Sequence, residues 1–109
     1  MIQWYTEHAH AWLATRVERL RRRIGVEPRQ IAVHDLGYRW GSCGNGVLKF
    51  HWRSILLPPG LAEYVVAHEL VHLLHPHHGP TFWRALGRSM PDYEQRRTEL
   101  RGLGPSLSW

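Results

Sequence analysis

The segment His68-Glu69-Leu70-Val71-His72 is the stretch on which the interpretation of this 109-residue chain depends. It spells His-Glu-x-x-His, and residues four apart lie one turn above each other on the same face of an α-helix. The two imidazoles can therefore bind one zinc ion from the same side. Glu69 projects beside the metal, where it can accept a proton from bound water. The motif predicts a zinc-dependent hydrolase, with a peptidase as the first candidate.

The residues around the motif predict a helix of about four turns from Pro59 to His75. Pro suits the first turn of a helix, and no Gly or Pro interrupts the pattern between Gly60 and Pro76. Nine histidines occur in the chain, so the motif needs this support from its surroundings. Two histidines buried in an apolar helix without a ligand would leave polar nitrogens to satisfy. One stripe of the predicted helix carries Leu61, Val65, His68 and His72.

A catalytic zinc site needs a third protein ligand and keeps a fourth position open for water. Three histidines follow the motif directly. His75 is expected on the helix but rotated away from the ligand face. Pro76 ends the helix and turns the chain, so that either His77 or His78 can return toward the metal. Spacing alone does not separate these two.

Further motifs accompany the helix. The chain reads His-Glu-Leu-x-His, five residues, then His78, with Phe82-Trp83 shortly after. With the other matching stretches, this run resembles the YgjP-like metallopeptidase family, relatives of the SprT-like zinc proteases. The resemblance covers about two thirds of the chain, residues 38–100. Its remaining motifs are Arg39-Trp40-Gly41-Ser42-Cys43, Trp52-Arg53, Leu56 to Pro59, and Met90-Pro91-Asp92-Tyr93 followed by Arg96 and Arg97.

The resemblance implies a zincin-like α+β fold and one Zn²⁺ held by His68, His72 and His78, with Glu69 as the general base. It also implies a peptide or protein substrate. Family members commonly carry a longer region before the Arg-Trp-Gly-Ser-Cys strand. This chain is therefore expected to be either a minimal member or a catalytic fragment.

The patterns along the chain predict one helix-rich domain over residues 1–109 with a small antiparallel sheet. It divides into an N-terminal helix within residues 1–25, the sheet within residues 30–52, and a zinc-binding helical part over residues 58–101. Gly44-Asn45-Gly46 predicts the turn of a hairpin. The tail from residue 102 to 109 is expected to be loose. The expected strands are 30–36, 38–42 and 47–52, and the expected later helices are 80–90 and 91–101.

In zincins the substrate typically lies as an added strand along the edge of the sheet, where backbone pairing accepts many sequences. The candidate edge is either the arm Val47–His51 or the segment Tyr38, Arg39, Trp40, Gly41 and Ser42, continuing to Cys43. A tetrahedral oxyanion also needs a donor beyond the metal. The sequence does not rank the candidates, each of which also suits an ordinary structural or surface role: Tyr93, His75, His77 and Arg39.

An alternative function is a zinc-stabilised nucleic-acid or protein binding module without turnover. A structural zinc site is closed by four protein ligands, and here the fourth would come from His75, His77 or Cys43. Glu69 argues against this alternative, because a structural site needs no base.

The chain carries a net charge of +5, and Lys49 is its only lysine. Such a basic balance suits phosphate partners, but basic residues at the end of a helix also complement the helix dipole. A nucleic-acid partner is therefore possible but not expected. The single Cys43, the lack of a secretory signal and the lack of a membrane span predict a cytoplasmic protein without a membrane partner. The arginines crowd the end of the first predicted helix: Arg16, Arg19, Arg21, Arg22 and Arg23.

Overall fold

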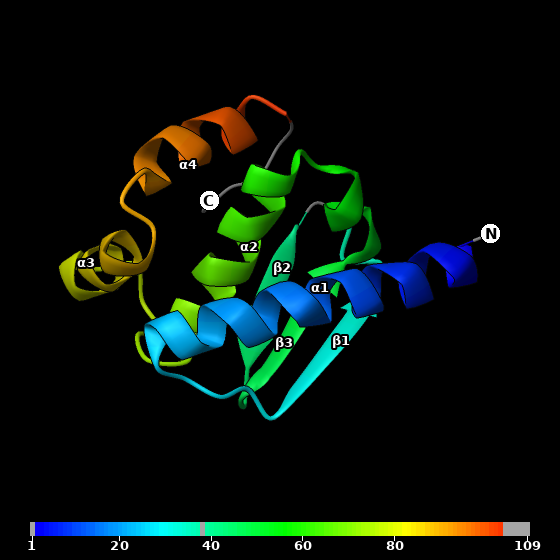
Figure 1. The fold of residues 1–109 in the computed structure, drawn as a ribbon, viewed down its shortest axis with the longest axis horizontal. Coiled ribbons are helices and arrows are strands. Elements are labelled where there is room, and N and C mark those ends of the chain that lie inside the picture. Colours follow the sequence, from blue (N-terminus) through cyan, green and yellow to red (C-terminus); the bar gives the residue numbers. More distant parts are fainter. Residues whose placement is uncertain (1, 38, 104–109) are drawn as a thin grey trace.

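The structure, a computed structural model, describes residues 2–37 and 39–103. Figure 1 shows α1 and α2 on the same face of a small sheet, with α3 and α4 beyond α2 on the side away from β1. This arrangement confirms the predicted helix-rich α+β fold. In chain order the elements are α1 (Ile2–Ile24), β1 (Gln30–His34), β2 (Gly41–Gly44), β3 (Val47–His51), the 3₁₀-helix η1 (Trp52–Leu56), α2 (Pro59–His72), α3 (Pro80–Ser89) and α4 (Tyr93–Arg101).

The predicted hairpin is present as β2 and β3, which pair antiparallel from Gly41↔Phe50 to Gly44↔Val47. Two residues, Asn45 and Gly46, form its turn with φ angles of 53° and 78°. A two-residue turn with positive φ at both positions matches the right-handed twist of the flanking strands. The turn therefore fixes which residues of β2 and β3 face each other.

The sheet is mixed, so the prediction of a wholly antiparallel sheet is wrong for β1. The strand order is β1-β3-β2, and β1 pairs parallel with β3 from Gln30↔Val47 to His34↔His51. The hairpin therefore places its second strand, β3, between β1 and β2. Since β3 is central, Val47–His51 is not an edge, and the free edges belong to β1 and β2.

Several boundaries differ from the predicted ones. Strand β1 stops at His34, because the main chain turns at Gly37, whose φ is 67° and whose N–H donates to Asp35 Oδ1 at 3.0 Å. The 3₁₀-helix η1 was not predicted; the His51 side chain caps it by accepting from Arg53 N at 3.0 Å. Helix α2 ends at His72, and the N–H groups of the next three residues donate to the main-chain oxygens of Leu70 and Val71.

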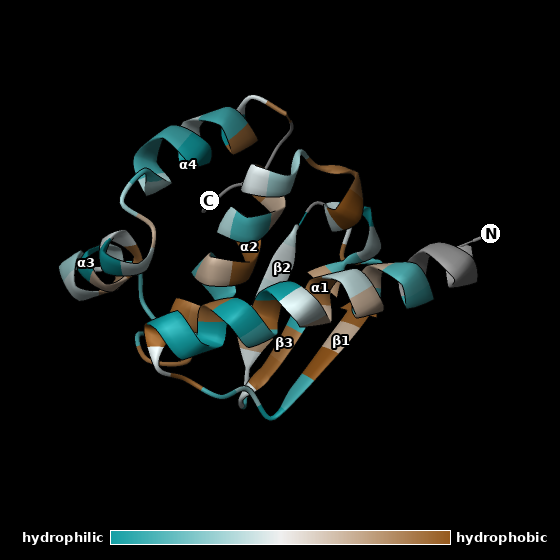
Figure 2. Ribbon diagram, viewed as in Figure 1, coloured by the Kyte–Doolittle hydropathy of each residue, from teal (hydrophilic) through white to brown (hydrophobic). Residues whose placement is uncertain are grey.

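The core lies between the sheet and the helices. Figure 2 shows hydrophobic residues along β1 and β3 and a hydrophilic outer side on α1. Leu13, Val17 and Leu20 form the buried stripe of α1, at the spacing of one helix face. Helix α2 is buried over most of its surface, including every residue from Tyr64 to Val71. Within the described residues, no helix combines the length and apolar character needed to cross a membrane.

The central position of β3 leads to a stability prediction. Leu48 is 0% exposed, whereas Leu56 is 62% exposed. Leu48→Ala should lower the free energy of unfolding by about 2–5 kcal/mol through lost burial and a new cavity. The control Leu56→Ala should change it by less than about 0.5 kcal/mol. Urea denaturation followed by circular dichroism measures both, and equal losses would contradict this account of the core.

Candidate metal centre

The burial of α2 brings two polar side chains of the motif into the interior. His68 and Glu69 are each 2% exposed, while His72, at the last turn, is half-buried. Helix α2 contacts the sheet, α1, α3 and α4, so polar residues near its middle have little access to water. Buried imidazole and carboxylate groups need polar partners or a metal.

Three histidines gather at the end of this helix. His72 Nε2 and His78 Nε2 lie 2.8 Å apart. The ring centre of His68 is 4.8 Å from that of His72 and 4.9 Å from that of His78. Each of the three histidines offers one ring nitrogen, and these nitrogens all lie within 4.8 Å of one another. In the described part of the chain, this is the group that can hold a metal ion.

The turn between α2 and α3 places His78 in this group. Gly79 is the N-cap of α3, and its carbonyl oxygen accepts from Trp83 N at 3.2 Å. Phe82, in the first turn of α3, is fully buried and packs against all three imidazoles at centroid distances of 5.1, 4.6 and 4.8 Å. The aromatic ring therefore supports the three histidines on one side.

The protonation of the three histidines suits metal binding. Burial lowers the pKa of His68, His72 and His78 below its usual range. Neighbouring charge lowers the pKa of His68 and His78 further, whereas the charge of Glu69 and the hydrogen bond to His75 O partly oppose the effect of burial on His72. Neutral imidazole is the form that binds a metal. His72 Nδ1 lies 3.1 Å from the carbonyl oxygen of His75, which assigns a proton to Nδ1 and leaves Nε2 as the ligand atom.

The donor set fits one metal ion. Ligand nitrogens around a tetrahedral zinc lie about 3.3 Å apart when each Zn–N bond is about 2.0–2.1 Å. The 2.8 Å between His72 Nε2 and His78 Nε2 is shorter, so the two rings would separate slightly around an ion. Three histidine ligands leave a fourth position for water or substrate, which is the ligand number of a catalytic zinc site.

Glu69 lies between the histidines and β2. Its Oε2 is 3.3 Å from His68 Nδ1, and its buried Oε1 has no hydrogen-bond partner among the described residues. Burial raises the pKa of Glu69 to about 8, against the opposing charges of His72 and Arg39. A Cβ at Gly41 of β2 would lie 3.1 Å from Glu69 Cγ. Glycine at this position therefore lets the strand approach the carboxylate.

The other predicted residues have distinct places. His75 is half-buried and touches the site through its main-chain carbonyl, whereas His77 is exposed and not part of the histidine group. The Tyr93 hydroxyl donates to Glu94 Oε1 at 3.2 Å. Cys43 is also outside the group, and burial raises its thiol pKa to about 11. Tyr38 lies outside the described residues.

One charged residue near the site was missed by sequence reasoning. The Arg97 guanidinium lies 4.5 Å from the ring centre of Trp83, which is itself 5.5 Å from the ring of His78. The charge of Arg97 contributes to the lowered pKa of both His68 and His78. The sequence analysis named Arg97 only within the segment of the family resemblance, and no local spacing connects α4 with the motif, so its contact with Trp83 was not predicted.

Fold and site together define the class. A buried helix with two histidines and a glutamate, a third histidine on the following turn and a small sheet beside the helix make a zincin-like metallopeptidase domain. The profile of the YgjP-like, metallopeptidase domain family matches residues 1–102, and the chain belongs to this family. The match also covers α1, which precedes the stretch of the initial resemblance.

Of two further comparisons, one gives a match, and it concerns the fold. No curated protein matches the chain. The crystal structure of the metallopeptidase zymogen of Pyrococcus abyssi abylysin is similar, with a TM-score of 0.72 at 16% sequence identity, covering 87% of this chain and 99% of that chain. At this identity the likeness supports the fold alone.

The approach of β2 to Glu69 leads to a paired prediction. A methyl group at Gly41 would lie 3.1 Å from both Glu69 Cγ and the main-chain oxygen of Lys49, whereas one at Gly44 would meet nothing within 4 Å. Gly41→Ala should therefore lower the free energy of unfolding by about 1–3 kcal/mol through overpacking. Gly44→Ala should stay within about 0.5 kcal/mol of the native protein. Urea denaturation measures both, and an unchanged Gly41→Ala protein would contradict the close approach.

The neighbouring histidines give a second prediction. His78→Ala should weaken zinc binding by more than the roughly 10- to 100-fold that the loss of an outer partner of a ligand costs. His77→Ala should bind zinc nearly as the native protein does, because His77 lies outside the histidine group. Competition with a chromophoric zinc chelator measures both affinities. The reverse order of losses would transfer the ligand role to His77.

Proposed function

We propose that this protein is a zinc-dependent peptidase that cleaves peptide bonds by general-base activation of water. One observation carries the proposal: three histidine nitrogens within 4.8 Å of one another lie beside a buried glutamate that is not part of their group. Membership of a metallopeptidase family supports a hydrolytic function. A peptide or protein is the corresponding substrate.

The residues have separate roles in this proposal. His68, His72 and His78 would hold one Zn²⁺, which supplies Lewis acidity to the water and to the scissile carbonyl. Glu69 accepts the proton of the attacking water and passes it to the leaving amine.

The free edge of β2 is the proposed substrate-binding strand. His51 N donates to Trp40 O at 2.8 Å, so Trp40 and His51 form a hydrogen-bonded pair of the antiparallel ladder. Because such pairs alternate, the N–H and C=O of Gly41 and Cys43 point away from β3. An extended peptide that pairs with these groups would pass next to Glu69, because Gly41 lies against its side chain.

The second oxyanion donor stays a proposal with four candidates. Arg39 is the candidate whose charge acts on Glu69, and it lies directly before the proposed substrate strand. The Tyr93 ring stacks on Trp83 at a centroid distance of 5.8 Å, next to the aromatic residues that support the histidines. His75 and His77 follow α2 on the same turn as His78.

The alternative, a zinc-stabilised binding module without turnover, has less support. A closed structural site would need His75, His77 or Cys43 as fourth ligand, and in the described part of the chain none of the three joins the histidine group. The high pKa of the Cys43 thiol also disfavours the thiolate that binds zinc. Such a module would have no use for Glu69 beside the metal.

The test is a Glu69→Gln variant. It should keep its zinc, because Glu69 is not a ligand, and lose hydrolysis by about 10²- to 10⁴-fold through loss of the general base. Zinc content by metal analysis and cleavage of a peptide library are measured on the same preparation. The exposed Glu99 of α4 provides the matched control, and Glu99→Gln should cleave as the native protein does. Undiminished cleavage by Glu69→Gln would refute the mechanism.

A further inference from the structure

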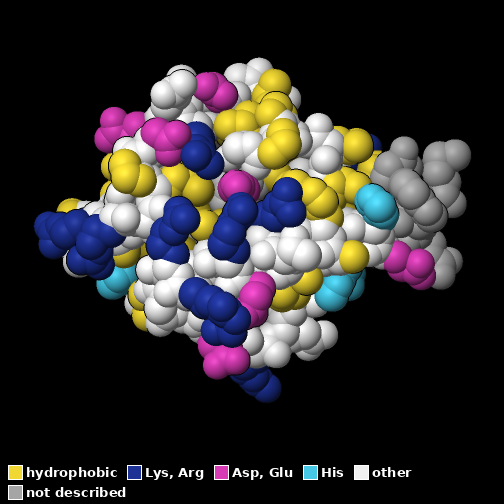
Figure 3. Space-filling view, viewed as in Figure 1, with side chains coloured by type: hydrophobic (Ala, Val, Ile, Leu, Met, Phe, Trp, Pro, Cys, Tyr) yellow, Lys and Arg dark blue, Asp and Glu magenta, His cyan; other side chains and the backbone are white. Residues whose placement is uncertain are grey.

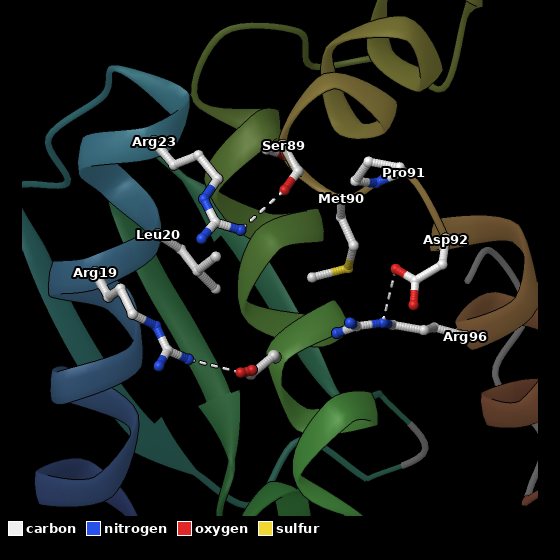
Figure 4. Close-up of a pocket in the computed structure, with 9 residues that line it drawn as sticks. Arg19, Leu20, Arg23, Ser89, Met90, Pro91, Asp92 and Arg96 are labelled. Atoms are coloured by element: carbon white, nitrogen blue, oxygen red, sulfur yellow. Dashed lines mark hydrogen bonds and ion pairs between the residues drawn. The ribbon is translucent and has the colours of Figure 1, made fainter.

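A second candidate site lies where α1 and α2 meet the link between α3 and α4. The volume of this pocket is about 320 Å³. In Figure 4 the side chains of Arg23, Met90 and Arg96 point toward it. Glu63, which lines it, lies five residues before His68 and thus about 140° away around α2. The pocket therefore faces a different side of the helix from the histidines, and no role in the metal centre accounts for it. Its lining residues are Arg19, Leu20, Arg23, Glu63, Ser89, Met90, Pro91, Asp92 and Arg96.

Three guanidinium groups from two helices line this pocket. Arg19 and Arg23 are one turn apart on α1, and Arg96 comes from α4. Arg19 Nη2 donates to Glu63 Oε1 at 2.6 Å. Arg96 Nε lies 3.1 Å from Asp92 Oδ1. Arg96 Nη1 also donates to the main-chain oxygen of Gly60 at 3.1 Å. Both guanidinium groups keep further N–H donors for a ligand beyond these contacts.

The charge of the pocket is not balanced. Arg23 Nη1 donates to the main-chain oxygen of Ser89 at 3.2 Å, which is a neutral acceptor. Among residues 2–37 and 39–103, no carboxylate lies within ion-pair distance of Arg23, so three arginines face two carboxylates. Figure 3 shows that Lys and Arg side chains gather over α1 on this face of the molecule. The excess positive charge would attract anions.

We propose that this pocket binds a phosphate-class oxyanion, and specifically a small phosphomonoester. A planar carboxylate is satisfied by one bidentate arginine, whereas a tetrahedral phosphate offers oxygens to several guanidinium groups at once. Pro91 is exposed at this pocket, with the buried Leu20 and Met90 behind it, and it adds an apolar surface that suits the organic part of such a molecule. The chemistry is shared with free inorganic phosphate, and affinity distinguishes the two sources.

The ligand would tie together parts of the fold that are far apart in sequence. Arg23 belongs to the end of α1, and Ser89, whose carbonyl it contacts, ends α3. A bound anion would add charge-assisted hydrogen bonds between α1 and α4 across the same pocket. Because a ligand that binds only the folded state stabilises it, phosphate should raise the melting temperature.

The test uses the purified metal-bound protein labelled with ¹⁵N and titrated separately with inorganic phosphate and phenyl phosphate. Amide signals of the pocket residues should shift together, and phenyl phosphate should bind more tightly because of the apolar surface. Arg23→Gln should weaken binding by about ten-fold, the loss of one charge-assisted hydrogen bond. The matched control is Arg22→Gln, which removes the same charge from the next residue, an arginine paired with Glu18 outside the pocket.

Each outcome decides the proposal. Shifts in the pocket that Arg23→Gln weakens and Arg22→Gln leaves unchanged support it. Equal affinity for both probes would overturn the assignment to a phosphomonoester in favour of a free-phosphate site. Shifts confined to the signals of His68, His72 and His78, or equal losses in both variants, would overturn it. Binding of an oligonucleotide without binding of either small probe would overturn it in favour of a nucleic-acid surface.

Discussion

The burial of two ionisable side chains within one helix is the constraint on which the structure depends. His68 and Glu69 lie in the interior of this chain of 109 residues, where desolvation disfavours the charged form of each. Accordingly, the pKa of Glu69 is raised to about 8 and the pKa of His68 is lowered. A bound dication would reverse this preference for the carboxylate, because a metal is the largest local charge in such a site.

The surrounding elements follow from this constraint. Helix α2 needs cover on nearly every side, which the sheet, α1, α3 and α4 provide. The glycine at position 41 lets β2 approach Glu69 closely. Phe82 packs under the three imidazoles, so the start of α3 and the return of His78 are coupled. The same residues therefore pack the core and shape the site, so a substitution among them should affect both the stability of the fold and the geometry of the site.

Local patterns predicted the parts of the fold that depend on neighbouring residues. The spacing of His68 and His72 and the apolar residues around them predicted α2, and Gly44-Asn45-Gly46 predicted the hairpin turn. The parallel pairing of β1 with β3 was not predicted, because it depends on which strand of the hairpin lies next to β1 in space. The cap of η1 was not predicted for a different reason: it depends on the orientation of the His51 side chain.

In the site, too, local spacing predicted some residues, whereas contacts between distant segments were not predicted. Helical spacing alone placed His68, Glu69 and His72 together, while spacing left His77 and His78 equivalent. The family resemblance favoured His78, and the structure brings His78 Nε2 to 2.8 Å from His72 Nε2. The position of Arg97 near these histidines depends on how α4 packs against α2 and on the contact of Arg97 with Trp83, which no sequence period encodes.

The central claim, an open three-histidine zinc centre, is tested most directly by X-ray absorption at the zinc edge of the metal-bound protein. The account predicts three imidazole ligands and one further light-atom ligand, all at about 2.0–2.1 Å. A sulfur scatterer at about 2.3 Å would place Cys43 on the metal. A fourth imidazole would likewise close the site. Either result would contradict the claim and favour a structural zinc site.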